Sequence, residues 1–191
     1  AAIFFSAVGA THLTLGWEYG SYRFTRYRKV AGELPALAAP VGTDLEYVRL
    51  ASEALGEARD LINTPANDLG PQELGEAVQR LALQHEAECR ITVGEDLLRQ
   101  NYPLIYEVGK GSAREPRLID MRWGKRGAPR VTLVGKGVCF DTGGLDIKPS
   151  SGMILMKKDM GGAALTLALA RMLMGADAPI ELRLLIPAVE N

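Results

Sequence analysis

An apolar segment, a glycine-initiated helix pattern and a second apolar segment follow one another over residues 131–187. Val131 to Val134 is almost entirely apolar, as expected of a strand that is buried on both faces. Gly161-Gly162 begins a run of Ala, Leu and Met that continues to about residue 174. The apolar stretch from Ile180 to Pro187 then reads as another strand. This order predicts a βαβ unit and therefore a sheet that helices at least partly cover.

Further short strands are predicted upstream, at about 89–93, 103–109, 116–123 and 130–136. The links between the last three are too short for crossover connections, so these segments are expected to pair as antiparallel neighbours. Combined with the βαβ unit, this predicts an α/β fold with a mixed β-sheet covered by helices.

Two helices are predicted before the strands. Thr43-Asp-Leu-Glu46 resembles a capping box, and the apolar spacing after it continues to Ile62. Asn63-Thr-Pro65 ends that helix, because a residue before proline avoids the α region. Pro71 suits the first position of the second helix.

The first forty residues are less regular. The stretch at 12–28 predicts a helix interrupted by its glycines, and the Pro/Gly-rich stretch at 32–42 predicts a linker. The apolar opening at 1–8 is too short to span a bilayer and has no basic segment typical of a signal peptide. A buried strand, or the ragged start of a truncated domain, explains it better.

The composition limits the possible functions. A net charge of −1 over 191 residues argues against a nucleic-acid surface spread over the whole molecule. One basic cluster, which fits the solvated face of a helix better than a nucleic-acid site, comprises Arg23, Arg26, Arg28 and Lys29. With only two cysteines no disulfide framework is indicated, which favours a reducing, cytoplasmic compartment. Neither histidine has metal-ligand spacing, so a metal would be held by oxygen and perhaps amine.

Two acids and two lysines gather around the strand that ends near residue 140. Asp141 follows that strand and Asp159 precedes the next helix, so both are expected at one edge of the sheet, where divalent cations bind carboxylates. Lys136 could join them as an amine ligand, since a nearby dication favours the unprotonated amine. Lys148 could stay charged and stabilise negative charge on a carbonyl oxygen. Taken singly, such residues are usually turn formers or solvated side chains.

The segment resembles the catalytic domain of the cytosolic leucine aminopeptidase family. The resemblance rests on the spacing Lys-x4-Asp-x6-Lys-x10-Asp, which starts at Lys136, and on Met156-Lys-Lys-Asp159-Met-Gly-Gly-Ala. Asn63-Thr-Pro-Ala-Asn67 and Pro116-Arg-Leu-Ile-Asp120 also resemble segments of that domain. The match extends over about residues 16–191.

The resemblance implies a phosphorylase/hydrolase-like catalytic fold and a two-metal aminopeptidase that removes N-terminal, leucine-type residues from peptides. Lys136, Asp141 and Asp159 would be metal ligands, with Asp141 bridging two divalent ions, zinc or manganese. Lys148 would be the catalytic lysine that polarises the scissile carbonyl. Met156 would line the pocket for the substrate's first side chain, although an ordinary core methionine fits the sequence nearly as well. Family members assemble as hexamers.

The family pattern also implies that the chain is a piece of a longer member. Residues 1–42 would be the remnant of an N-terminal domain and linker helix, and residues 43–191 the N-terminal portion of the catalytic domain. The family's second motif, Asn-Thr-Asp-Ala-Glu-Gly-Arg, supplies more carboxylates and an arginine and would lie beyond Asn191. The chain alone is therefore expected to hold a partial metal site and to be nearly inactive.

Other functions remain open from the sequence. Phe140-Asp141-Thr-Gly resembles the turn of an aspartic peptidase, although Gly144 stands where Ser or Thr is expected. Cys139 with His85 is a weaker candidate for a cysteine nucleophile, because a buried cysteine is the default. A DNA-binding or non-catalytic assembly role would belong to a different class.

Overall fold

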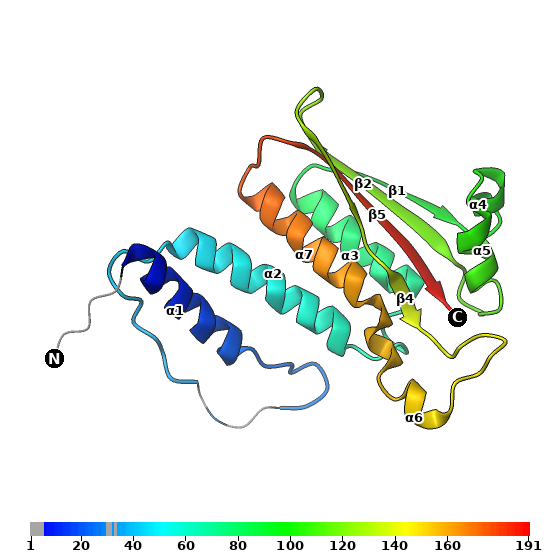
Figure 1. The fold of residues 1–191 in the computed structure, drawn as a ribbon, viewed down its shortest axis with the longest axis horizontal. Coiled ribbons are helices and arrows are strands. Elements are labelled where there is room, and N and C mark those ends of the chain that lie inside the picture. Colours follow the sequence, from blue (N-terminus) through cyan, green and yellow to red (C-terminus); the bar gives the residue numbers. More distant parts are fainter. Residues whose placement is uncertain (1–5, 30–31, 33) are drawn as a thin grey trace.

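The fold is built on one five-stranded mixed sheet (Figure 1). The computed structural model describes residues 6–29, 32 and 34–191. The strands follow the order β1-β2-β5-β3, and β4 also pairs with β5. Their bounds are β1 Glu88–Val93, β2 Arg117–Gly124, β3 Arg130–Val134, β4 Gly137–Phe140 and β5 Glu181–Glu190.

Strand β5 lies in the middle of this sheet. One edge of β5 pairs antiparallel with β2. The other edge pairs in parallel with β3 along the first half of β5 and with β4 along its last residues. The predicted βαβ unit is confirmed, since β3 and β5 are parallel neighbours joined through the helix α7, Gly161–Gly175. The mixed sheet is confirmed as well. Lys136 falls in the short joint between β3 and β4.

Three strand predictions were wrong. Residues 103–109 form the helix α5, Pro103–Gly109, in which Pro103 takes the first position that suits proline. Strands β2 and β3 are not neighbours, because β5 inserts between them. Val131–Val134 is not buried on both faces either, because Thr132 is exposed and Val134 is 65% exposed.

Four longer helices lie to one side of the sheet (Figure 1). They are α1 Ala7–Ser21, α2 Leu45–Asn63, α3 Pro71–Gln84 and α7. Helices α3 and α7 lie against the sheet, α2 packs along α7, and α1 packs on α2. Shorter helices are α4 Asp96–Arg99, α5 and α6 Ser150–Met153, with the 3₁₀ turn η1 at Met156–Met160. The predicted helices at 43–62, from 71 and from 161 are confirmed within a few residues.

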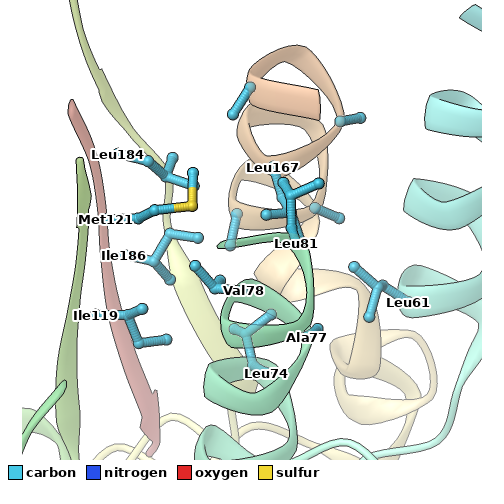
Figure 2. Packing of buried hydrophobic residues seen from close by; sticks show 14 of the residues in the cluster. Leu61, Leu74, Ala77, Val78, Leu81, Ile119, Met121, Leu167, Leu184 and Ile186 are labelled. Carbon is cyan, nitrogen blue, oxygen red and sulfur yellow. The ribbon is translucent and has the colours of Figure 1, made fainter. Parts of the chain in front are cut away.

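The main core lies between the sheet and helices α3 and α7 (Figure 2). Ile119 and Met121 of β2 and Leu184 and Ile186 of β5 point from the strands towards the helices, and all are fully buried. Facing them are side chains of α3 and α7, namely Leu74, Val78, Leu81 and Leu167. This apolar layer fixes the sheet against both helices, so the loops at the ends of the strands start from rigid positions.

The N-terminal region departs from its prediction. Helix α1 runs unbroken through Gly16 and Gly20 and ends at Ser21, so the glycines do not interrupt it. The basic cluster at 23–29 therefore follows the helix and is not one of its faces. Asp44, not Thr43, caps α2 by accepting a hydrogen bond from the backbone N–H of Tyr47 at 3.0 Å. The predicted linker at 32–42 is irregular where it is described, and residues 1–5 lie outside the described residues.

Within the described ranges, no helix is both long enough and apolar enough to span a membrane.

Candidate functional site

Lys136 is held in a tight joint between two glycines. A Cβ on Gly135 would lie 2.6 Å from the Cα of Ala163 in α7, and one on Gly137 would lie 2.8 Å from Cγ2 of Ile186. Only glycine permits this close approach to a helix on one side and a strand on the other. The backbone N–H of Ala163 donates to the Lys136 carbonyl at 2.9 Å. The joint thus fixes the backbone of Lys136 against the start of α7.

The amine of Lys136 contacts Asp159 in the 3₁₀ turn η1. The Nζ atom lies 2.8 Å from both carboxylate oxygens. The Lys136 side chain is 61% exposed, whereas that of Asp159 is 16% exposed. An ion pair with so exposed a partner contributes at most about 1 kcal/mol to folding. Separating this ion pair would therefore cost the fold little.

The second acid, Asp141, lies directly after β4 and pairs with Lys148. Lys148 donates from Nζ to Oδ2 of Asp141. The other oxygen, Oδ1, accepts from the backbone N–H of Gly143 at 2.8 Å and from Nδ2 of Asn191 at 3.1 Å. The hydrogen bond from Lys148, followed by those from Gly143 and Asn191, lowers the pKa of Asp141 despite partial burial. The carboxylate is therefore anionic at neutral pH.

The loop after Asp141 needs its glycines. Gly143 and Gly144 have φ values of +95° and +64°, a region that other residues rarely adopt. A Cβ on Gly144 would also lie 2.6 Å from Oδ1 of Asn191. The turn thereby brings Lys148 back to Asp141, with a backbone hydrogen bond from Lys148 N–H to the Thr142 carbonyl at 2.9 Å.

The structure thus arranges the four motif residues as two acid–amine pairs, one at each end of β4. Lys136 and Asp141 flank the four-residue strand β4, and the turn η1, which carries Asp159, packs against β4. In the part of the chain that the structure describes, no three His, Cys, Asp or Glu side chains gather closely enough to hold a metal. Two carboxylates and an amine match the donor types of a hard or borderline cation, but they do not complete its ligand set.

Met156 begins the turn η1 and is half-buried. It is not part of the buried core cluster, unlike the fully buried Met160 in the same turn. Its position three residues before Asp159 is compatible with lining a site at this turn.

A cavity of about 930 Å³ opens beside the Asp141 loop. Its walls include Asn67, Arg114, Phe140, Thr142, Glu190 and Asn191. Asp141 and Lys148 do not line it, although residues on either side of Asp141 do. Arg114 holds the walls together by donating to the Asn67 carbonyl at 2.7 Å and to Glu190 at 3.1 Å. The cavity is large enough for a short peptide next to the acid–amine pair.

Sequence reasoning missed the residues that hold the motif in place. Asn191 is far from Asp141 in the sequence, so spacing gives no signal for their contact. Asn63 is predictable as the end of a helix and as part of a family-like segment, but no sequence pattern indicates that its carbonyl accepts a hydrogen bond from Lys157 at 2.6 Å. Contacts between distant segments of this kind need the fold itself.

A cysteine nucleophile is not supported at Cys139. The thiol is 1% exposed, and burial raises its pKa to about 12. A nucleophilic cysteine needs a low pKa and access to solvent. His85 lies at the C-terminal end of α3, where burial and then Arg171 lower its pKa.

Comparison with known proteins gives the same family throughout. Residues 57–191 match the model of the cytosol aminopeptidase family, catalytic domain. Peptidase B of Pectobacterium atrosepticum is 42% identical over 85% of this chain and 40% of its own length.

Two solved structures share the fold. The crystal structure of cytosol aminopeptidase from Coxiella burnetii has a TM-score of 0.89 and 52% identity, over 93% of this chain and 38% of that one. The bottromycin maturation enzyme BotP, solved in complex with Mn, has a TM-score of 0.86 and 35% identity. The match covers 97% of this chain and 40% of that one. The chain thus spans about two fifths of the length of these relatives. By its family match and its fold, the chain belongs to the cytosol aminopeptidase family, and its residues 57–191 match the catalytic domain.

Proposed function

We propose that the chain carries part of the active site of a metal-dependent aminopeptidase that removes N-terminal, leucine-type residues from peptides. The observation that carries this proposal is the arrangement of Lys136, Asp141, Lys148 and Asp159 as two acid–amine pairs flanking β4. The family match supports the reaction class.

Lys136, Asp141 and Asp159 would hold divalent cations, with Asp141 shared between two of them. The BotP structure contains Mn, which supports manganese, and zinc suits the same donors. Bound cations would polarise the substrate carbonyl and lower the pKa of a water. The exposed ammonium of Lys136 would give up its proton on binding, because a nearby dication penalises a second positive charge.

Lys148 would act on the substrate as a charged group. Its hydrogen bond to the Asp141 carboxylate keeps the ammonium at the metal-binding acid. From there a protonated Nζ can donate a hydrogen bond to the carbonyl oxygen of the peptide bond that is cleaved. Negative charge that develops on this oxygen would be stabilised by an electrostatic contact of the oxyanion-hole type. Met156 would contact the first side chain of the substrate.

For the chain alone we propose weak metal binding and negligible turnover. Only two carboxylates and one amine are proposed as ligands, and the described residues contain no group of three acidic, histidine or cysteine side chains that could hold a metal. A dication held by so few ligands dissociates readily. We also propose residues 43–191 as the N-terminal portion of the catalytic domain and residues 1–42 as the remnant of a preceding domain; the family model supports the catalytic domain from residue 57 onward. A cytoplasmic location, suggested by the relatives' name cytosol aminopeptidase, is part of the proposal. Hexamer assembly is proposed from the family resemblance alone.

The competing functions have less support. Asp141 hydrogen-bonds to a lysine, an amide and a backbone N–H, and its lowered pKa is the opposite of what a proton-sharing carboxylate dyad needs. In the basic cluster, Arg23 donates to the Gly20 and Tyr22 carbonyls and Arg26 stacks on Tyr27. These two guanidinium groups are thus engaged within the chain.

A chimera tests the proposed function. This chain would replace the matching segment of the Coxiella burnetii enzyme, and release of p-nitroaniline from leucine p-nitroanilide would be measured with Mn²⁺. We expect an active, chelator-sensitive chimera in which Lys148→Met lowers kcat about 10²- to 10³-fold. The control is Lys158→Met, which replaces an exposed lysine of η1 and should retain activity. A folded chimera without activity, or one that is indifferent to Lys148→Met, would refute the proposal.

A further inference from the structure

The turn η1 is held by three side chains that point in different directions. Asp159 pairs with Lys136, Met160 is fully buried in the main core, and Lys157 donates to the carbonyl of Asn63 at 2.6 Å. The turn is only five residues long. A segment this short has few backbone hydrogen bonds of its own, so its orientation depends on such external contacts.

The partner of Lys157 is a helix end. Asn63 is the last residue of α2, and the final carbonyls of a helix have no partner within it. These carbonyls also carry the negative end of the helix dipole. The ammonium of Lys157 satisfies one of them and places its charge where the dipole favours it. This contact joins α2 to η1 across 94 residues of sequence.

Lys158 provides a contrast within the same turn. Its side chain is exposed, and no hydrogen bond or ion pair of its ammonium is found among the described residues. Lys157, by comparison, is half-buried. Two adjacent lysines therefore differ in whether they reach the helix end.

We propose that Lys157 is a positioning residue for the metal site: by anchoring η1 to the C-terminal end of α2, it aims Asp159 at Lys136. The proposal deepens the proposed function and rests on it for the role of Asp159 as a metal ligand. Lys157 does not contact the ligands. It acts through the backbone of the turn that carries one of them.

The first test uses the metal-free chain and does not depend on the metal function. Amide hydrogen exchange would be compared in the wild type, Lys157→Met, Lys157→Arg and the control Lys158→Met. The reporters are the N–H of Gly161, bonded to the Lys158 carbonyl, and that of Ala163, bonded to the Lys136 carbonyl at 2.9 Å. In Lys157→Met the loss of a charged hydrogen bond should speed exchange of both N–H groups by about 10-fold or more. Arg should restore the wild-type rates, and Lys158→Met should not change them.

The second test measures the dissociation constant of Mn²⁺ by titration calorimetry. Loss of a supporting contact to a metal-binding segment typically weakens binding about 10-fold or more, which we expect for Lys157→Met and not for Lys158→Met. Should the wild type bind no Mn²⁺ while the exchange pattern is as expected, the positioning role stands and the metal function fails.

The positioning role would be overturned if Lys157→Met left exchange at Gly161 and Ala163 unchanged. It would also be overturned if the variant only lowered the melting temperature, with Mn²⁺ affinity as in the wild type, or if Lys158→Met had equal effects.

Discussion

Lys136 and Asp159 form an ion pair in which one ammonium lies 2.8 Å from both oxygens of the carboxylate. The acid is supplied by the turn η1 and the amine by the joint between β3 and β4. An ammonium equidistant from two carboxylate oxygens marks a position at which the carboxylate can chelate a cation. This relationship connects the fold to the proposed chemistry.

The packing of α3 in the hydrophobic core can be tested by mutation. Leu74 is fully buried against the sheet, whereas Leu83 on the same helix is 81% exposed. Leu74→Ala should lower the free energy of unfolding by about 3 kcal/mol, through lost burial and the cavity left behind. Leu83→Ala should change it by less than about 0.5 kcal/mol. Urea denaturation followed by circular dichroism measures both, and equal effects would contradict the packing described.

The loop after Asp141 can be tested through its first positive-φ glycine. Gly143 and Gly127 have φ values of +95° and +87°, but a Cβ on Gly127 would meet nothing within 4 Å. A Cβ on Gly143 would clash with the Asp146 carbonyl oxygen and lie 3.1 Å from the Lys148 nitrogen. Both alanine variants carry the backbone strain of about 1 kcal/mol.

Gly143→Ala should therefore be less stable than Gly127→Ala by about 2 kcal/mol or more. Thermal unfolding of the two purified variants makes the comparison. Equal stability would mean that the 141–148 loop does not close as described.

A pH-dependent ion pair lies on the sheet between β2 and β5. Asp120 accepts from Arg183 at 2.9 Å and 2.8 Å through its two oxygens. Burial alone would raise the pKa of Asp120, but the hydrogen bonds from Arg183 and Arg122 outweigh it and lower the pKa. The pair therefore stabilises the fold fully above the unfolded pKa of about 3.9, and this stabilisation is lost as pH falls through the folded value.

Asp120→Asn should cost about 1 kcal/mol at pH 6, and the difference from the wild type should shrink towards zero as the pH falls below the unfolded pKa of about 3.9 and then through the folded value. Asp146→Asn, at an exposed position, is the control and should show little difference at either pH. A difference for Asp120→Asn that stays constant from pH 6 to pH 3 would exclude the ion pair as its cause.

Much of the fold followed from local patterns. The helices at 45–63, 71–84 and 161–175 were predictable because apolar spacing and Pro65 and Pro71 mark them. The strand expected at 103–109 failed because its apolar run is too short to distinguish a strand from a helix, and Pro103 as a helix start was overlooked. The order of strands could not be predicted from link lengths, because β5 comes last in the sequence and pairs between β2 and β3.

The candidate site followed from motif spacing, but its supports did not. Positions 136, 141, 148 and 159 were predictable as candidate site residues. The pairing of Lys136 with Asp159 and of Lys148 with Asp141 was not predictable, because it depends on the folded positions of separate segments. The contacts of Asn191 with Asp141 and of Lys157 with Asn63 join segments that only the folded chain brings together.

The most direct test of the central claim is a calorimetric titration of the chain with Mn²⁺, comparing the wild type with Asp159→Asn and with Asp146→Asn. The exposed Asp146 lies in the same loop as Asp141 but in neither acid–amine pair, so its variant controls for lost negative charge. The account predicts weak binding by the wild type and Asp146→Asn, and affinity at least about 10-fold lower for Asp159→Asn. Equal Mn²⁺ affinity for all three proteins would contradict it.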